Sequence, residues 1–124
     1  MGKYIEFEKL EVWQLGVELV KETYSLIKGF PDDEKYGLSS QLKRASVSIP
    51  ANIAEGYGRY HYLEKTNFYL NARGSLFELR SHLLIAKELN LINTPNLEKL
   101  LPLVNKLGVK LNNLITSTRE KKED

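Results

Sequence analysis

The chain of 124 residues contains no cysteine. A disulfide framework, a thiolate metal site and a thiol nucleophile are therefore excluded, and the composition suits a reducing compartment. Long apolar runs are also missing: residues 83–86 (LLIA) form one of the longest, far short of the roughly 20 residues that cross a bilayer. The first residues, MGKYIEFEKLE, are acidic and lack the apolar centre of a secretory signal. We expect a soluble, cytoplasmic protein with no membrane partner.

The apolar residues that are present recur at steps of three and four, which is the spacing of amphipathic helices. Four such segments are predicted, at about residues 8–28, 37–56, 63–90 and 95–118, within a single domain covering residues 1–124. No segment has the alternation of a strand. Long helices joined by short loops predict an all-α fold, an antiparallel up-down-up-down four-helix bundle.

The first helix carries two apolar stripes. The stripe with 3-4-3-4-3 spacing has the pattern of a packed seam, and the other lies on a different face. We left open whether the second stripe contacts a partner subunit or a deep bundle core. The first stripe is Leu10, Trp13, Val17, Val20, Tyr24 and Ile27, and the second is Val12, Leu15, Leu19 and Leu26.

Proline and glycine interrupt the later helices. Pro50 lies inside the second helical pattern, where it should bend the helix or remove a hydrogen bond, and Gly56 offers a stop. Gly74 lies in the middle of the third helix, where it costs roughly 1 kcal/mol relative to alanine, so close approach of another backbone is the expected reason. Pro102 should kink the fourth helix or postpone its regular start.

Charge is distributed unevenly, although the net charge is only +2. Residues 1–34 hold four Lys against eight Asp or Glu, a net charge of −4, whereas residues 35–87 hold eight Lys or Arg against three Glu, a net charge of +5. Clustered positive charge attracts phosphate backbones. The alternative is that oppositely charged helices pair with one another.

Patterns of catalytic or metal-binding residues are scarce. Glu78 and His82 lie one helical turn apart, but two ligands do not make a metal site. The G-x-G at Gly56 follows no strand and so does not indicate a phosphate loop. Three tyrosines interleaved with Arg59 and His61 could stack on unpaired bases or pack the bundle end. We expect no enzyme activity, no cofactor and no metal.

Three runs of sequence resemble a known family. They are FEKLEVWQLGVELVKETYSL, LSSQLKRASVSIPANIAEGYGRYHY and FYLNARGSLFELRSHLLIAKEL, with RASVSIPANIAEG and ARGSLFEL as the most specific parts. They are similar to the bacterial four-helix-bundle proteins encoded in intervening sequences of 23S ribosomal RNA genes, a family that also includes accessory variability proteins of diversity-generating retroelements. The similarity covers roughly residues 7–110.

The resemblance implies a homopentameric ring that binds structured RNA, ribosomal RNA among the possibilities, or a reverse-transcriptase complex. It also implies that Ile49 and Ile53 are core residues, that Gly56 is a cap, and that Asn52 and Glu55 form hydrogen bonds between helices or subunits. The other positions that match the family motifs are Arg44, Ser48, Pro50, Arg59, Arg73, Gly74, Ser75 and Glu78.

Two functions follow as expectations. The first is a non-enzymatic oligomer that binds RNA or another structured nucleic acid through basic surfaces of the second and third helices. The alternative is a protein-binding scaffold whose charges pair between subunits. The candidate contacts are Lys43, Arg44, Arg59, Lys65, Arg73 and Arg80.

Overall fold

Four long helices make up most of the chain. The computed structural model describes residues 6–34 and 37–121, and within these ranges every regular element is helical. The long helices are α1 (Glu11–Ile27), α2 (Leu38–Tyr57), α3 (Tyr62–Glu88) and α4 (Thr94–Arg119), with single 3-10 turns η1 (Phe7–Lys9) and η2 (Asp32–Glu34) before α1 and α2. The predicted all-α class is confirmed, and the predicted start of the first helix lies in η1 instead of α1.

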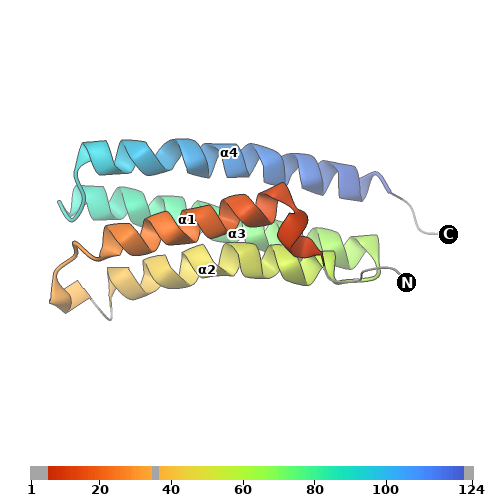
Figure 1. Cartoon of the computed structure of the whole chain (residues 1–124), viewed down its shortest axis with the longest axis horizontal. Helices are drawn as coiled ribbons and strands as arrows, with labels where there is room; N and C mark the ends of the chain where they lie inside the picture. Colours follow the sequence, from red (N-terminus) through yellow and green to blue (C-terminus); the bar gives the residue numbers. More distant parts are fainter. Residues whose placement is uncertain (1–5, 35–36, 122–124) are drawn as a thin grey trace.

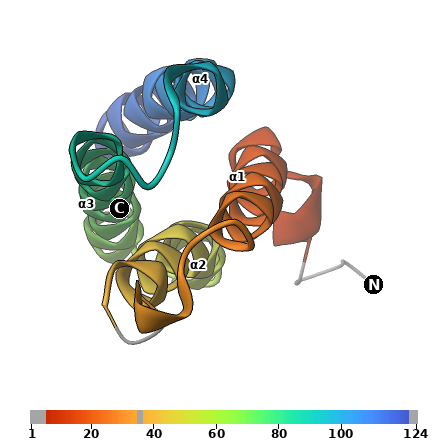
Figure 2. The ribbon, with the colours of Figure 1, turned by 90° about the vertical axis from the view of Figure 1, so that its left-hand side faces the viewer.

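The helices follow one another around the bundle in chain order (Figure 1, Figure 2). Each packs against its neighbours in sequence, and α4 closes the bundle against α1, whereas the diagonal pairs α1–α3 and α2–α4 bring no Cα atoms within 8 Å of each other. The contact between α2 and α3 is the most extensive. This is the four-helix bundle that the apolar spacing predicted. No helix of the described residues is long and apolar enough to cross a membrane.

The core stripe of α1 differs from the prediction. Its buried residues are Val12, Gly16, Leu19, Thr23 and Ile27. The stripe expected to form the seam is instead partly exposed, and its Tyr24 is 40% exposed. The prediction was wrong because Gly16 and Thr23 were not counted as core positions; a glycine can face a neighbouring helix closely, and the Thr23 hydroxyl donates to the Leu19 carbonyl oxygen at 2.7 Å.

Pro50 does not interrupt α2, which continues as helix to Tyr57. Of the two effects expected at this residue, a bend or a missing hydrogen bond, the missing hydrogen bond follows from the absence of an amide hydrogen. Pro50 cannot donate a hydrogen bond to the Ser46 carbonyl, but its buried ring packs against α1, where a Cβ on Gly16 would lie 3.3 Å from the Pro50 Cβ. Pro102 is likewise contained within α4, whose start at Thr94 is not postponed.

Two glycines inside the helices have opposite surroundings. A Cβ on Gly56 would lie 2.7 Å from Cε1 of Tyr69, a side chain so buried that its pKa is raised to about 12 by desolvation, with Tyr57 adding to the shift. Gly56 is therefore a packing glycine inside α2, not the cap that was expected; the C-cap is Gly58. A Cβ on Gly74 would meet nothing within 4 Å. Within the described chain the close approach expected at Gly74 is absent.

Candidate nucleic-acid interface

The six basic residues predicted as contacts do not share one surface. Lys43 lies on the α1 side of α2, with its ammonium 5.4 Å from the centre of the Tyr24 ring. Arg44 points instead toward α3, where it meets Glu78. The remaining four fall into two pairs, one in a groove between α3 and α4 and one at the end of the bundle. The prediction of a single basic surface on α2 and α3 therefore does not match the geometry.

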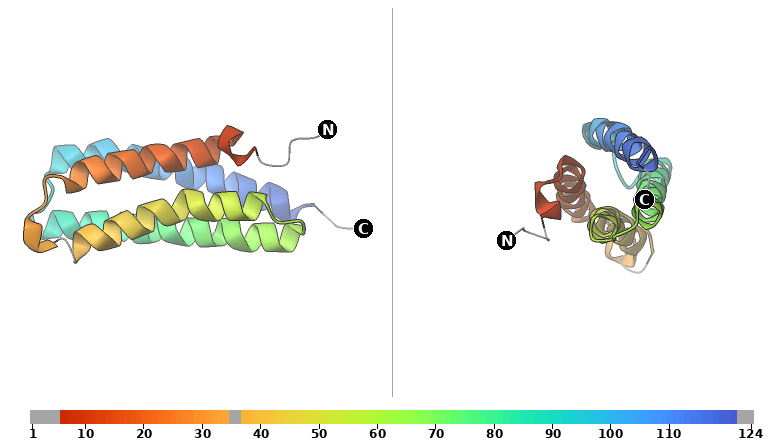
Figure 3. Two further views of the ribbon diagram at one scale, coloured as in Figure 1. Left: turned by 60° about the horizontal axis from the view of Figure 1, so that its bottom comes forward. Right: turned by 90° about the vertical axis from the view of Figure 1, so that its right-hand side faces the viewer.

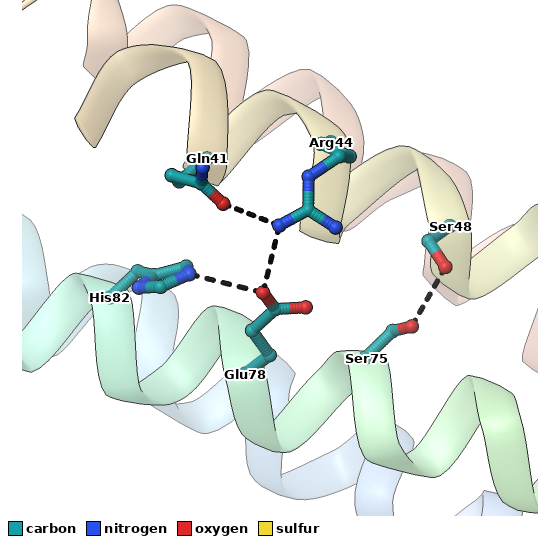
Figure 4. Close-up of polar contacts among 6 residues, drawn as sticks. All are labelled: Gln41, Arg44, Ser48, Ser75, Glu78 and His82. Atoms are coloured by element: carbon teal, nitrogen blue, oxygen red, sulfur yellow. Dashed lines mark hydrogen bonds and ion pairs between the residues drawn. The ribbon is translucent and has the colours of Figure 1, made fainter. Parts of the chain in front are cut away.

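Arg44 belongs to a polar seam between α2 and α3 (Figure 4). Its Nη2 lies 3.0 Å from Oε2 of Glu78, and the same guanidinium donates to Gln41. One turn along α3, Nε2 of His82 lies 3.3 Å from the same Glu78 oxygen. Arg44 and Glu78 are largely exposed, so the ion pair contributes little to stability, and we interpret it as a device that fixes the register of the two helices.

The same seam continues toward the bundle end through hydroxyl groups. The Ser48 and Ser75 hydroxyls are 2.7 Å apart, and Asn52 donates from its amide nitrogen to the Ser48 carbonyl oxygen at 2.8 Å. Glu55 pairs with Arg59, four residues along the same segment, at 2.9 Å. The hydrogen bonds of Asn52 and Glu55 therefore lie within one segment, so the role expected for both residues between helices is not seen in the described part of the chain. Asn52 supports the Ser48–Ser75 contact from within α2.

The seam explains why two separate motifs carried the family resemblance. Arg44, Ser48 and Asn52 come from one motif, and Ser75 and Glu78 come from the other, so the motifs bond to each other across the α2–α3 interface. Ile49 and Ile53, between these polar positions, are fully buried, as predicted. The motif residues of the seam therefore stabilise the contact between the two helices, and a ligand site has to be sought among side chains outside the seam.

The seam offers no metal site in the described ranges. His82 is the one described residue with a buried side-chain nitrogen, its Nδ1, that has no hydrogen-bond partner. Among residues 6–34 and 37–121, no three His, Asp or Glu side chains lie together as metal ligands would. Glu78 and His82 are thus a pair, as the sequence indicated.

Arg73 and Arg80 line one groove between α3 and α4, with a volume of about 290 Å³. Its floor is apolar, and Asn105 and Asn112 stand on the α4 side. Arg73 donates from Nη1 to Oδ1 of Asn112 at 3.1 Å, and Phe77, 59% exposed, lies beside it. No Asp or Glu is among the lining residues. The groove therefore combines uncompensated cations, amide groups and an exposed aromatic ring.

Arg59 and Lys65 lie at the end of the bundle where α2 passes into α3. The Lys65 ammonium donates to the carbonyl oxygen of Tyr57 at 2.7 Å, so it caps the C-terminus of α2. Burial lowers the pKa of Lys65, and the nearby ammonium of Lys121 lowers it further. Much of the bonding capacity of Lys65 is therefore already used within the fold.

Several residues of these two places escaped the sequence analysis. Asn105, Asn112 and Lys121 all come from α4 or its end, where the spacing of polar residues carries no signature. Only the bundle brings them beside α3. Counting charges along the chain could not identify these residues, because they come near α3 only through contacts between segments far apart in sequence.

A scan against protein-family models matches residues 8–113 to the 23S rRNA-intervening sequence protein family. The chain belongs to this family. The match spans α1, α2, α3 and most of α4 and includes both motifs of the α2–α3 seam. A search of curated proteins found no match. Membership in the family confirms the resemblance to the 23S rRNA intervening-sequence proteins, and the relation to retroelement proteins stays a prediction.

Proposed function

We propose that this family member is a non-enzymatic, homo-oligomeric protein that binds structured RNA through the α3–α4 groove. The observation that carries the proposal is the pair Arg73 and Arg80 in one groove without a carboxylate. Two guanidinium groups that face no acidic side chain favour phosphate, which arginine binds with two parallel hydrogen bonds. The amides of Asn105 and Asn112 suit polar atoms of sugars and base edges.

The form of the ligand follows from the spacing of these cations. Arg73, Arg80 and Lys87 are seven residues apart, so they fall on nearly the same edge of α3, about 10 Å from one to the next. A row of separated positive charges fits a phosphate backbone that runs along the helix better than it fits one small anion. Lys87 was missed among the candidate contacts.

Self-association accompanies the binding function. Exposed apolar side chains lie on the outside of α1 and α2, including Tyr24 and Val47, and on the outside of α3, including Leu84, Ile85 and Leu89. Apolar patches of this kind mark interaction surfaces. The chain acts as a homo-oligomer, and a pentameric ring is the assembly that the family resemblance implies. A ring would repeat the groove around its circumference and multiply its charge.

Salt-dependent RNA retention tests the proposal. Wild-type protein should shift ribosomal RNA fragments in a gel at low salt, and the affinity should fall steeply as salt rises. Arg80→Ala should lower the slope of log K against log salt by about 1, because one phosphate contact is lost. Lys106→Ala, an exposed lysine of α4 outside the groove, is the matched control and should leave the slope unchanged. Absence of retention at low salt would refute RNA binding.

A protein-binding scaffold is the second candidate, and the exposed apolar residues favour it. Phe77 lines both the α3–α4 groove and an adjacent hollow formed by Leu84, Ile85 and Leu89. If a partner protein covers this face, Phe77→Ser should abolish binding of that protein. Arg80→Ala should then leave the retention of RNA in the gel unchanged. Arg44→Ala and Arg73→Ala should then lower the mass measured by light scattering, because their charges would pair between subunits.

A further inference from the structure

The end of the bundle where α2 passes into α3 exposes an aromatic ring. Tyr60 is 87% exposed, more than any other large apolar or aromatic residue of the described chain. It lies in the connection between Tyr57, where α2 ends, and Tyr62, where α3 begins. Its ring meets the ring of His61 edge-on, with 5.0 Å between centres and an angle of 87° between planes. A T-shaped contact of this kind covers at most one face of the Tyr60 ring.

Cations gather at the same end of the bundle as this exposed ring. Three positively charged side chains lie over aromatic rings at this end: Arg59 over Phe68 at 4.6 Å, Lys65 over Tyr57 at 5.4 Å, and Lys121 over Tyr62 at 5.6 Å. The end of α4 reaches the same end of the bundle as the α2–α3 connection (Figure 1, Figure 3). Contacts with rings hold these long side chains in place, so less conformational freedom is lost when a ligand binds.

Two positive charges at this end of the bundle are not paired with a negative charge within the described chain. Neither Lys65 nor Lys121 has a carboxylate partner among the described residues. A hollow of about 250 Å³ lies beside Lys121, between the first turns of α3 and the last turn of α4. Arg119 and Lys121 are its charged lining residues, with no Asp or Glu. An anion placed there would be attracted by both side chains and would relieve the repulsion between the two lysines.

We propose that this end of the bundle binds an unpaired segment of RNA, with one base stacked on Tyr60 and an adjacent phosphate held by Arg119 and Lys121. An exposed, flat ring next to cations suits a nucleotide, which joins a π-face to a phosphate. An acidic peptide would use the cations and leave the ring without a partner. The inference rests on the proposed RNA-binding function, but it concerns a different surface from the α3–α4 groove.

Fluorescence anisotropy with a short labelled oligouridine tests this site. Tyr60→Ala should weaken binding by roughly five- to hundred-fold, the range observed when a stacking ring is removed. Tyr60→Phe keeps the ring and should bind like the wild type. Lys121→Glu should weaken binding as well. Lys28→Glu reverses an exposed charge at the C-terminus of α1, at the other end of the bundle, and, as the matched control for Lys121→Glu, should leave the affinity unchanged.

Each other outcome overturns the inference. Oligouridine that fails to bind the wild type at low salt contradicts it, and so does a Tyr60→Ala variant that binds normally. Equal losses in Tyr60→Ala and Tyr60→Phe would exclude stacking, and displacement by polyglutamate without any effect of Tyr60 would indicate an acidic protein partner. Arg80→Ala separates the two proposals: it should weaken retention of structured RNA while the effect of Tyr60 on oligouridine persists. Dependence on Arg80 without dependence on Tyr60 refutes only the end site.

Discussion

Gly56 and Gly74 differ at the scale of single residues, although both lie inside helices. Gly56 is buried where α2 meets α3, and a Cβ there would press against the ring of Tyr69 and the Cβ of Phe68, at 2.7 and 3.0 Å. Gly74 is exposed on α3 and a Cβ there would meet no atom within 4 Å. The low helix propensity of glycine is the same at both positions, so the packing around each residue decides how an alanine substitution changes the stability.

Alanine substitutions should therefore have opposite effects on the free energy of unfolding. Gly56→Ala should lower it by about 1–3 kcal/mol, because overpacking displaces a buried ring. Gly74→Ala should raise it by about 1 kcal/mol, because alanine is the better helix former and nothing has to move. Urea denaturation at low protein concentration measures both changes. A destabilising Gly74→Ala would contradict this account and indicate that another copy of the chain packs closely at this position.

At the scale of elements, the start of α4 is the clearest local signal. The Asn93 side chain accepts a hydrogen bond from the backbone amide of Asn96 at 2.9 Å, and Pro95 lies in the first turn. The residue types alone predict this arrangement, since asparagine satisfies a free amide and proline has none to satisfy. The start of α3 has no such side-chain cap, and the C-terminus of α2 is capped by Lys65 of α3.

Asn93→Ala should lower the free energy of unfolding by about 1 kcal/mol, the usual cost of losing an N-cap side chain. Asn93→Asp keeps an acceptor at the same place and should be close to the wild type. Thermal and urea denaturation of the two variants provide the measurement. An equal loss in both variants would show that the cap hydrogen bond is not what stabilises the start of α4.

Prediction from sequence succeeded where the information is local to an element. Helical spacing predicted the four helices. Prediction failed for the core stripe of α1, because Gly16 and Thr23 are not apolar by type, and it did not reveal the contact between the Pro50 ring and Gly16. The α3–α4 groove was not predicted for the same reason, because Arg73 and Asn112 come together only when the two helices pack.

At the scale of the whole molecule, the exposed apolar residues form two unlike faces. The outer α1–α2 face consists of the exposed Tyr24 and Val47 and the half-buried Trp13, Val17 and Val20, and the outer α3 face consists of the exposed Phe77, Leu84, Ile85 and Leu89. The helices α1 and α3 are diagonal in the bundle, so the faces point to different sides (Figure 2). Two faces on different sides allow each copy to bind one neighbour with each face, which is the head-to-tail contact that generates rings.

Mixing two defective variants distinguishes this arrangement from a symmetric dimer. Val47→Glu places a charge on the outer α1–α2 face and Ile85→Glu places one on the outer α3 face, at residues that are 44% and 43% exposed, so both variants should fold. If unlike faces bind each other, each variant alone should be monomeric by light scattering, because every contact needs both faces intact. A mixture retains one intact pair of faces and should form dimers that grow no further. If like faces bind each other, each variant should still dimerise alone through its intact face, and that result would contradict head-to-tail assembly.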